Sequence, residues 1–408
     1  MVKGWCITAD ILMILLQCSG LPVSGWRYDM KKLNYGMVGG GNGAFIGDVH
    51  RRGAFLGGYA NLVCGCFTRN AEKNQEAAKQ WGVTESARVY HSYQEMAQAE
   101  ASREDGIDFV AITTPNDTHY EIAKTFLKKG IHVICDKPVT STAEQAKELK
   151  RIAAENNLCF GVTYSYFGYA MVHQAREMIE SGKIGEIVYV TAEYPQDWLL
   201  LNLRDEETRK KMWRINPERA NGSLCTVDIG THLEALIHAA TGLTITKVLA
   251  RFDYTVDNLP LETNSNVMLQ LSNGASGNLW SSIVAIGHDA DVKIRIYGTR
   301  GSLEWYHQKA GLLKYAQLGE PVQYLAMNRD YNGADSRSLS HLPAGHPEGY
   351  YEAFGNIYEA FCKDVMARQS GILEKQYHYP DIDDGIWGVR FVDACVESNE
   401  KGNIWITL

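Results

Sequence analysis

Two short segments of the sequence carry the residue types that proton transfer requires. The segment CDKPVT places Lys137 directly after an apolar run, and VDIGTHLEAL places Asp228 four residues before His232. Four residues is close to one helical turn, so the carboxylate and the imidazole share one helix face. A histidine base oriented by a carboxylate, together with a lysine that hydrogen-bonds a hydroxyl, can deprotonate an alcohol. We therefore predict Lys137, Asp228 and His232 as catalytic residues.

The residues of the second segment also fit a different structure. His232 could equally be a core histidine, with Asp228 as a helix cap. The region offers no further histidine or cysteine at metal-ligand spacing, so we predict no metal site.

The glycine-rich stretch GMVGGGNGAFIG indicates a second kind of chemistry. Gly39, Gly41 and Ala44 fit the pattern G-x-G-x-x-[GA], between an expected strand and an expected helix. That position lets the backbone approach a pyrophosphate at a helix N-terminus, as in dinucleotide-binding folds. Later strand ends, TTPND and CDKP, should line the same cofactor groove. The predicted cofactor-binding residues are Gly39, Gly41, Asn42, Gly43, Ala44, Phe45, Ile46, Thr68, Arg69, Thr113, Thr114, Pro115, Asn116, His119, Asp136 and Lys137.

The residues alone leave the choice between NAD and NADP open. NAD-binding folds place an acidic residue at the end of the second strand, where it binds the ribose hydroxyls. Here that strand ends with Thr68 and Arg69, which could meet a 2′-phosphate, while Arg69 could also lie over the adenine.

The order of the expected elements predicts two domains. In residues 32–157 apolar strands alternate with helices of ten to fifteen residues, which is typical of a doubly wound parallel sheet, the α/β Rossmann fold. In residues 158–408 longer strands are joined by polar and glycine turns and flanked by three helical segments. This second pattern predicts an α+β domain with an open, mainly antiparallel sheet that binds substrate and forms oligomers.

Charge and composition exclude some partners. The net charge is −8 with no basic run, so no nucleic-acid partner is expected. No apolar run reaches the length of a membrane span, and nine cysteines without a C-x-x-C pair favour the reducing cytoplasm. Residues 1–31 are expected to be an extension outside the fold, with a poor signal peptide as the alternative.

Several motifs together resemble the glucose–fructose oxidoreductase and inositol dehydrogenase (Gfo/Idh/MocA) family. They are GMVGGGNGAFIG, TTPNDTHYEIAKTFLKKGIHVICDKP, GKIGEI, DIGTH and IYGTRGSLEW, in this order. The family's Glu-Lys-Pro is here Asp136-Lys137-Pro138. The resemblance implies that Lys137 and His232 are catalytic, with Asp228 beside them. It also implies oxidation of hydroxyls on sugars, inositols or polyols with NAD or NADP, in dimers or tetramers packed through the open sheet.

Four further motifs resemble those of family members that oxidise intact glycosides or anhydrosugars with NAD: GGGNGAFIGDVHR, YPQDWL, WRINPERANGS and HPEGYYEAFGNIYEAF. This resemblance implies oxidation of a secondary hydroxyl of a glucoside, at C3, to a ketone. An inositol or polyol dehydrogenase, a glycosidase that uses transient oxidation by NAD, and a binding protein without turnover are the alternatives. Aromatic and hydrogen-bonding residue types suited to a pyranose ring give the expected substrate-binding set: Tyr164, Tyr166, Trp198, Trp213, Arg214, Asp228, His232 and His346.

Overall fold

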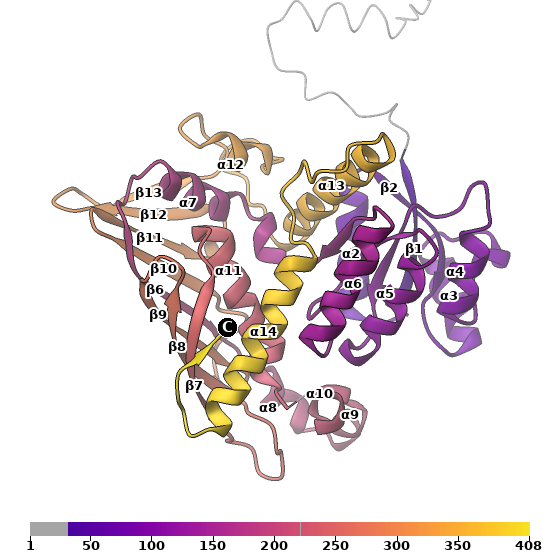
Figure 1. The fold of residues 1–408 in the computed structure, drawn as a ribbon, viewed down its shortest axis with the longest axis horizontal. Coiled ribbons are helices and arrows are strands. Elements are labelled where there is room, and N and C mark those ends of the chain that lie inside the picture. Colours follow the sequence, from indigo (N-terminus) through magenta and orange to yellow (C-terminus); the bar gives the residue numbers. More distant parts are fainter. Residues whose placement is uncertain (1–31, 221) are drawn as a thin grey trace, which may run out of the picture. The chain divides into compact units, whose positions relative to one another are not determined.

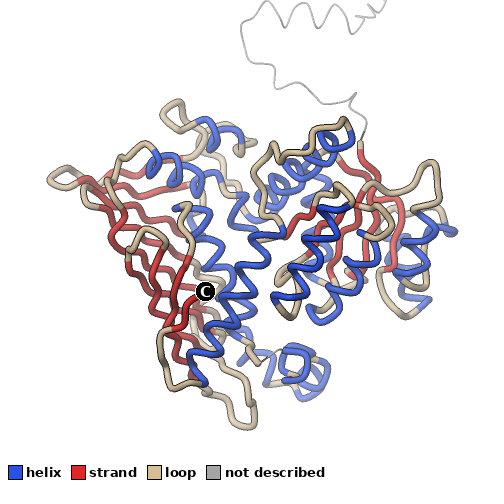
Figure 2. Tube along the Cα trace, in the orientation of Figure 1, coloured by secondary structure: helices blue, strands red, loops and turns tan. Residues whose placement is uncertain are grey.

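The computed structural model describes residues 32–220 and 222–408, and these contain two β-sheets. Figure 2 shows the strands in two separate groups with helices between them. The expectations for residues 1–31, an extension or a signal peptide, lie outside the described residues.

The first sheet has five parallel strands in the order β2-β1-β3-β4-β5. The strands are β1 (Leu33–Gly39), β2 (Ala60–Cys66), β3 (Phe109–Thr113), β4 (His132–Cys135) and β5 (Phe160–Val162). The chain order reverses between β1 and β3, and ligands of such sheets bind at this point, outside the carboxyl ends of the strands. The predicted Rossmann fold is confirmed.

Helices cover both faces of this sheet, as Figure 1 shows. Three of them begin at a side-chain cap, which satisfies backbone N–H groups of the first turn: Asn70 accepts from the amide of Lys73, Ser92 from that of Glu95, and Thr142 from that of Gln145. The helices of this domain are α2 (Phe45–Gly57), α3 (Ala71–Gln80), α4 (Tyr93–Glu100), α5 (His119–Leu127) and α6 (Ala143–Glu155).

The parallel sheet also takes chain from beyond residue 157. Strand β5 forms its edge, and α13 (Tyr350–Gln369) packs on α2. Phe354, Tyr358 and Phe361 of α13 are buried in one cluster with residues of β1 and β3. The expected boundary at 157/158 therefore does not coincide with the edge of this packing unit, because a late amphipathic helix returns to cover the sheet.

The second sheet has nine strands in the order β13-β12-β11-β10-β6-β9-β8-β7-β14. Only β6 and β9 are paired in parallel; the other neighbours are antiparallel. The predicted open, mainly antiparallel sheet is confirmed. Its strands are β6 (Ile187–Pro195), β7 (Ile245–Asp253), β8 (Asn264–Leu271), β9 (Ser276–Ser282), β10 (Lys293–Gly298), β11 (Gly301–Tyr306), β12 (Leu312–Gln317), β13 (Gln323–Ala326) and β14 (Ile406–Thr407).

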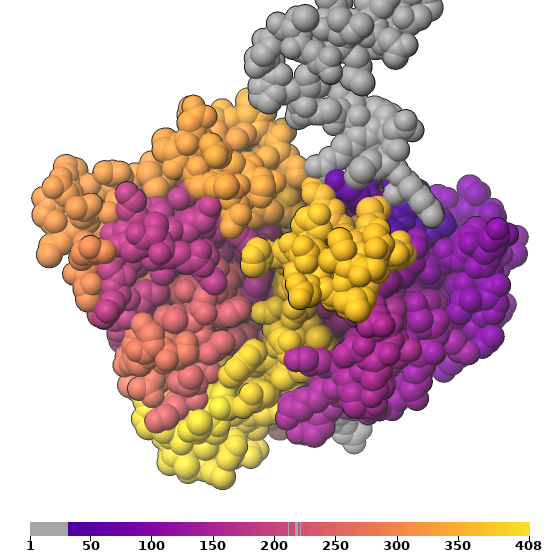
Figure 3. Space-filling view, turned by 45° about the horizontal axis from the view of Figure 1, so that its top comes forward, coloured from indigo at the N-terminus to yellow at the C-terminus, as the bar shows by residue number. Residues whose placement is uncertain are grey.

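Helices α7 (Ala170–Glu180), α11 (Thr231–Thr241) and α14 (Ile382–Glu400) pack on one face of the nine-stranded sheet. Their apolar side chains join alternate residues of the strands in one core cluster. Helix α14 also contacts α6 and β5 of the parallel domain. In Figure 3 the yellow C-terminal segment accordingly lies between the purple parallel domain and the sheet domain in pink and orange.

Candidate active site

Lys137 and Asp228 come from different domains and are in direct contact. Lys137 follows β4 by two residues, and its Nζ donates a hydrogen bond to the backbone oxygen of Asp228. The same Nζ lies 3.4 Å from Oδ1 of the Asp228 carboxylate. Asp228 lies in a π-helical turn, η5 (Thr226–Gly230), that leads into α11. Such wide turns are rare and frequently occur at functional sites.

Two cations hold the Asp228 carboxylate in its ionised form. Burial opposes ionisation, but Lys137 and Arg214 outweigh it and keep the pKa of Asp228 below its usual value. The Arg214 Nε lies 3.6 Å from Asp228 Oδ1. A half-buried carboxylate that stays charged can fix the position of both cations.

His232 stands in the first turn of α11, beside Asp228. Its side chain is buried, and its Nδ1 has no hydrogen-bond partner among the described residues. The rings of Tyr166 and Tyr194 lie 5.4 and 6.1 Å from the imidazole, centroid to centroid. Burial and the positive charge of Lys137 lower the pKa of His232 to about 3. The imidazole is therefore neutral near pH 7 and can accept a proton.

A buried polar network lies beneath Lys137. The Asp136 carboxylate accepts a hydrogen bond of 3.1 Å from the Thr163 hydroxyl and lies 3.8 Å from Nε2 of His50. The other nitrogen of His50 is 2.8 Å from the hydroxyl of Tyr358 on α13. Burial disfavours the charge on Asp136, yet His50 and Lys137 hold the pKa of this carboxyl below its usual value. The anion next to Lys137 is thus retained in the interior.

The glycine-rich loop between β1 and α2 fits a dinucleotide phosphate. Gly39, Gly40 and Gly43 have φ of +88°, +75° and +83°, which side chains rarely adopt. A Cβ on Gly39 would lie 2.8 Å from the carbonyl carbon of Thr113. The loop therefore packs directly on the end of β3 and leads into the N-terminus of α2. Phosphate oxygens can accept hydrogen bonds from the backbone amides there, in the favourable field of the helix dipole.

The Gly47→Ala variant is expected to bind NAD⁺ about tenfold more weakly or worse, because an added Cβ would lie 2.3 Å from the Cα of Gly40. The loop would have to move away from α2. Isothermal titration with NAD⁺ measures this loss. Gly349→Ala is the matched control, since a Cβ at Gly349 meets no atom within 4 Å. Unchanged affinity in Gly47→Ala would mean that this loop does not hold the cofactor.

The other residues expected to bind cofactor surround the loop, with one exception. Asn42, Gly43, Phe45 and Arg69 are exposed, and Thr68 is half-buried at the end of β2. Thr113 is buried at the end of β3, and its hydroxyl donates to the carbonyl of Val38. Pro115 and Asn116 begin the short turn η2 (Asn116–Thr118) before α5. His119 is the exception, because its ring is fully buried and both its nitrogens contact backbone carbonyls.

A helical segment between β6 and η5 brings three of the expected substrate residues together. It contains α8 (Trp198–Leu203), α9 (Glu206–Lys211), η4 (Trp213–Ile215) and α10 (Pro217–Ala220). The Trp213 ring lies near two guanidinium groups, with its centroid 4.7 Å from that of Arg214 and 5.6 Å from that of Arg219. Arg219 also forms a two-fold hydrogen-bonded pair with Asp117 of the parallel domain, at 2.9 and 2.8 Å. The segment is therefore anchored next to the Lys137–Asp228 contact.

The last two expected substrate residues are placed differently. Tyr164 lies 6.2 Å from His232, centroid to centroid, but is completely buried, and its hydroxyl fills the space that a Cβ on Gly388 of α14 would occupy. His346 lies on an exposed loop, where its Nδ1 is 2.9 Å from the carbonyl oxygen of Pro343. Neither side chain is placed like one that grips a sugar, because packing of α14 encloses the first and the second stays in solvent.

Three further residues lie near His232 and were not predicted. Tyr194 ends β6 against His232, and His307 follows β11 with its ring 5.7 Å from that of Tyr166. Tyr350 begins α13, 6.4 Å from both His307 and Phe45. Tyr194 begins the segment YPQDWL and Tyr350 lies within HPEGYYEAFGNIYEAF, whereas no local pattern marks His307, which reaches the site from a distant part of the chain.

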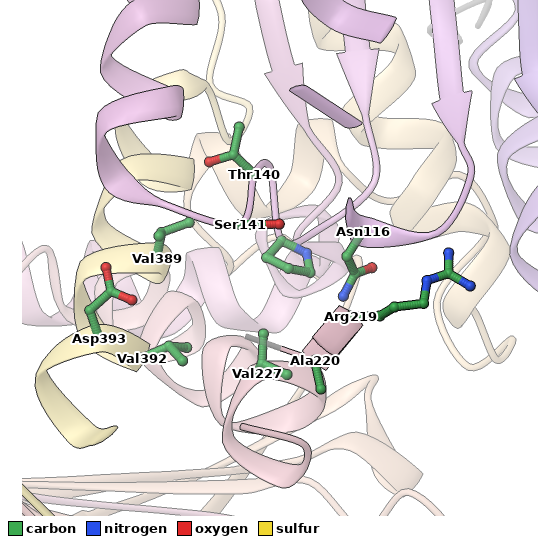
Figure 4. Close-up of a pocket in the computed structure, with 10 residues that line it drawn as sticks. Asn116, Thr140, Ser141, Arg219, Ala220, Val227, Val389, Val392 and Asp393 are labelled. Atoms are coloured by element: carbon green, nitrogen blue, oxygen red, sulfur yellow. The ribbon is translucent and has the colours of Figure 1, made fainter. Parts of the chain in front are cut away.

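A crevice between the domains adjoins the site. Figure 4 shows Asn116, Thr140 and Ser141 from the parallel domain opposite Val227 and Val389 from the sheet domain. Its lining includes Pro138 and Val227, the direct neighbours of Lys137 and Asp228, but not those two residues or His232. The crevice therefore borders the contact between Lys137 and Asp228 but contains neither residue.

The Glu234→Gln variant is expected to be less sensitive to alkaline pH than the wild type. Burial, and then the nearby carboxylate of Asp384, raise the pKa of Glu234 from 4.5 to about 8. Between these values the folded state holds more protons than the unfolded state, so stability falls as pH rises. The loss is at most about 1.4 kcal/mol per pH unit.

Thermal unfolding of the two proteins from pH 5 to pH 9 measures this effect. The Tm of Glu234→Gln minus the Tm of the wild type should increase as the pH rises. The exposed Glu104→Gln serves as the control. Parallel Tm curves for wild type and Glu234→Gln would contradict the prediction.

Comparison with known proteins agrees with this geometry. Residues 33–164 match a family described as an oxidoreductase family with an NAD-binding Rossmann fold, and residues 172–304 match a GFO/IDH/MocA C-terminal domain. An uncharacterized oxidoreductase, YfiI of Bacillus subtilis, is 36% identical over 95% of this chain and 99% of its own length. Levoglucosan dehydrogenase of Pseudarthrobacter phenanthrenivorans is 26% identical over 92% of this chain and 98% of its own.

Solved structures of an inositol dehydrogenase homolog from Azotobacter vinelandii also resemble this fold. The complex with NAD⁺ has a TM-score of 0.88 at 35% identity, and the complex with NADH and myo-inositol has 0.86 at 35% identity. Each alignment covers 93% of this chain and 98% of the other. The predicted family and cofactor are thereby confirmed. The chain belongs to the Gfo/Idh/MocA family of NAD-binding oxidoreductases.

Proposed function

We propose that the protein oxidises a secondary hydroxyl of a six-membered polyhydroxylated ring to a ketone, with C3 of a glucoside as the first candidate. The observation that carries this proposal is the contact between Lys137 and Asp228, which joins the end of β4 to the helix turn that bears His232. The two segments meet at the carboxyl end of β4, the neighbour of β3 on the far side from the switch point.

The residues at this junction divide the work of removing a proton. His232 is neutral, and because its Nδ1 is enclosed by protein, Nε2 is the nitrogen that can take the hydroxyl proton. Lys137 donates hydrogen bonds and, held by Asp228, can stabilise the oxygen as negative charge develops there. Bound NAD⁺ would supply the acceptor for the hydride, which leaves the carbon that bears this hydroxyl. Asp228 fixes the positions of the Lys137 amine and the His232 imidazole relative to each other.

The surroundings support a ring with many hydroxyls. Trp213 offers a flat apolar face, and the adjacent Arg214 offers guanidinium donors. Tyr166 and Tyr194 enclose the imidazole on its inner side. An aromatic surface beside a few polar groups is the usual recognition set for a pyranose or a cyclitol.

An inositol is the second candidate substrate. The structure of the Azotobacter homolog, at 35% identity, holds myo-inositol, whereas the curated levoglucosan dehydrogenase is 26% identical to this chain. Both ligands present secondary hydroxyls on a six-membered ring, so the proton-transfer residues serve either one.

A substrate panel tests the proposal. Methyl glucoside, levoglucosan and myo-inositol are each incubated with NAD⁺ and with NADP⁺, and NADH or NADPH is followed by absorbance. Highest kcat/KM for methyl glucoside or levoglucosan, with a 3-keto product by NMR, supports the first candidate, and highest kcat/KM for myo-inositol supports the second. Release of an aglycone without net NADH would instead indicate a glycosidase. No turnover of any ring polyol would refute the proposal.

We also propose that the protein self-associates through the outer face of the nine-stranded sheet. Alternate residues on that face expose apolar side chains, among them Tyr189, Met268, Tyr297 and Leu312. Ion pairs such as Lys293–Glu193 and Arg295–Glu193 lie among them. Light scattering tests the proposal: a Met268→Arg variant should be smaller in solution than the wild type, and a monomeric wild type would refute it.

We propose a cytoplasmic location, which rests on the thiols. The seven cysteines in the described part of the chain are free and buried. Burial raises the pKa of Cys66 to about 11, so this thiol is unreactive. Among residues 32–408, apart from 221, no helix is long and apolar enough to cross a membrane. Fractionation of cells with an antibody against the protein tests the location, and recovery outside the cytoplasm would refute it.

A further inference from the structure

His119 begins α5, directly beneath the site, and is completely buried. Its Nδ1 lies 2.8 Å from the carbonyl oxygen of Pro138, the residue after Lys137. Its Nε2 lies 2.8 Å from the carbonyl oxygen of Thr114, at the end of β3. The ring thus spans the two strand ends on which the cofactor groove and the reacting lysine depend.

Both contacts of the ring are with hydrogen-bond acceptors. A carbonyl oxygen cannot donate, so each contact at 2.8 Å requires an N–H on the ring nitrogen that faces it. A neutral imidazole has only one N–H, and either tautomer would direct a ring lone pair at a carbonyl oxygen. Only the imidazolium satisfies both contacts at once.

Negative charge is available to balance such a cation. Burial lowers the pKa of His119 below its ordinary value, and it outweighs the Asp136 carboxylate, the two carbonyl oxygens and Asp117, which act in the opposite direction. These carboxylates are the titratable groups that face the ring. Asp136 is in turn held ionised by His50 and Lys137. The carboxylate therefore interacts with His50 and His119 as well as with Lys137.

We infer that His119 is protonated on both ring nitrogens and acts as a positioning residue, tying the Thr114 turn to the Lys137–Pro138 segment. The consequence for Lys137 rests on the proposed function, whereas the protonation does not. The His119 imidazolium, hydrogen-bonded to both strand ends, fixes the backbone that carries the Lys137 side chain. It also explains why this histidine is buried beside the groove instead of lining it.

His132 is a matched histidine with the opposite environment. It lies on β4, is also buried, and its Nδ1 accepts a hydrogen bond of 2.8 Å from the amide of Cys159. That nitrogen must be unprotonated, and burial lowers the pKa of His132 to about 4. His119 and His132 therefore differ in the expected protonation of their ring nitrogens and can be compared within one domain.

NMR of the full chain labelled with ¹⁵N-histidine tests the protonation directly. Signals are assigned by their loss in His119→Gln and in His132→Asn. At pH 7.5 both ring nitrogens of His119 should show a bonded proton, and Nδ1 of His132 should show none. An unprotonated ring nitrogen on His119 at this pH overturns the inference, whatever the enzyme is found to oxidise.

Kinetics test the positioning role, using whichever polyol the panel identifies. His119→Gln retains one donor and should lower kcat by about 10- to 100-fold, because small misplacements of a reacting group have effects of that size. His132→Asn should keep kcat near that of the wild type even if its Tm falls as far as that of His119→Gln. Equal kcat for His119→Gln and wild type, or equal loss in both variants, overturns the positioning role.

Discussion

Replacing Lys137 with methionine is expected to lower kcat by about 100- to 10,000-fold, the range that a positioned proton-transfer group contributes. Methionine keeps the length and the apolar stem of the side chain but removes the amine. That amine contacts both the backbone oxygen and the carboxylate of Asp228. Without it, the hydroxyl of the substrate loses its donor, and the half-buried Asp228 loses a cation that keeps it ionised.

Affinity for NAD⁺ separates this effect from loss of the fold. Binding of NAD⁺ to Lys137→Met, followed by protein fluorescence, should stay close to that of the wild type, because the glycine loop is untouched. The exposed Lys128→Met, at the C-terminal end of α5, is the matched control and should retain full kcat. A Lys137→Met enzyme with near-normal kcat would exclude Lys137 from the chemistry.

The His232→Asn variant is expected to lose kcat by a similar factor, about 100- to 10,000-fold. Asparagine can still form hydrogen bonds but cannot take up a proton. In the proposed mechanism Lys137, Asp228 and His232 act as one unit, so the double variant Lys137→Met/His232→Asn should be scarcely slower than either single variant. Losses that multiply in the double variant would show that the two residues act independently.

The pH dependence of kcat/KM provides a second test of His232. A base is active only when deprotonated, and its deprotonated fraction falls as the pH drops through its pKa. With a pKa lowered to about 3, mainly by burial, His232 stays deprotonated throughout an assay from pH 5 to pH 8. The wild-type profile should therefore show no loss from this residue on the acid side. An acid limb near the ordinary histidine pKa that disappears in His232→Asn would contradict this.

Much of the fold was predictable because it depends on local sequence patterns. The alternation of strands and helices up to about residue 157 and the glycine loop between β1 and α2 depend on periodicity and on turn residues, which act over a few positions. The short strands β5 and β14 and the capped helix α14 were not predicted. Strands of two or three residues carry too little pattern, and β5 is defined only by its pairing with β4.

By itself, the sequence determined which residue types stand at the ends of which elements: a lysine after the fourth parallel strand, an aspartate and a histidine one turn apart, and glycines before the first helix. Only the tertiary structure decided which of the candidates meet. It joined Lys137 to Asp228 across 91 positions, enclosed Tyr164 beneath α14, turned His119 inward and left His346 in solvent. The reason is physical, because such contacts depend on how whole helices and sheets pack, and that free energy is summed over many residues distant in the chain.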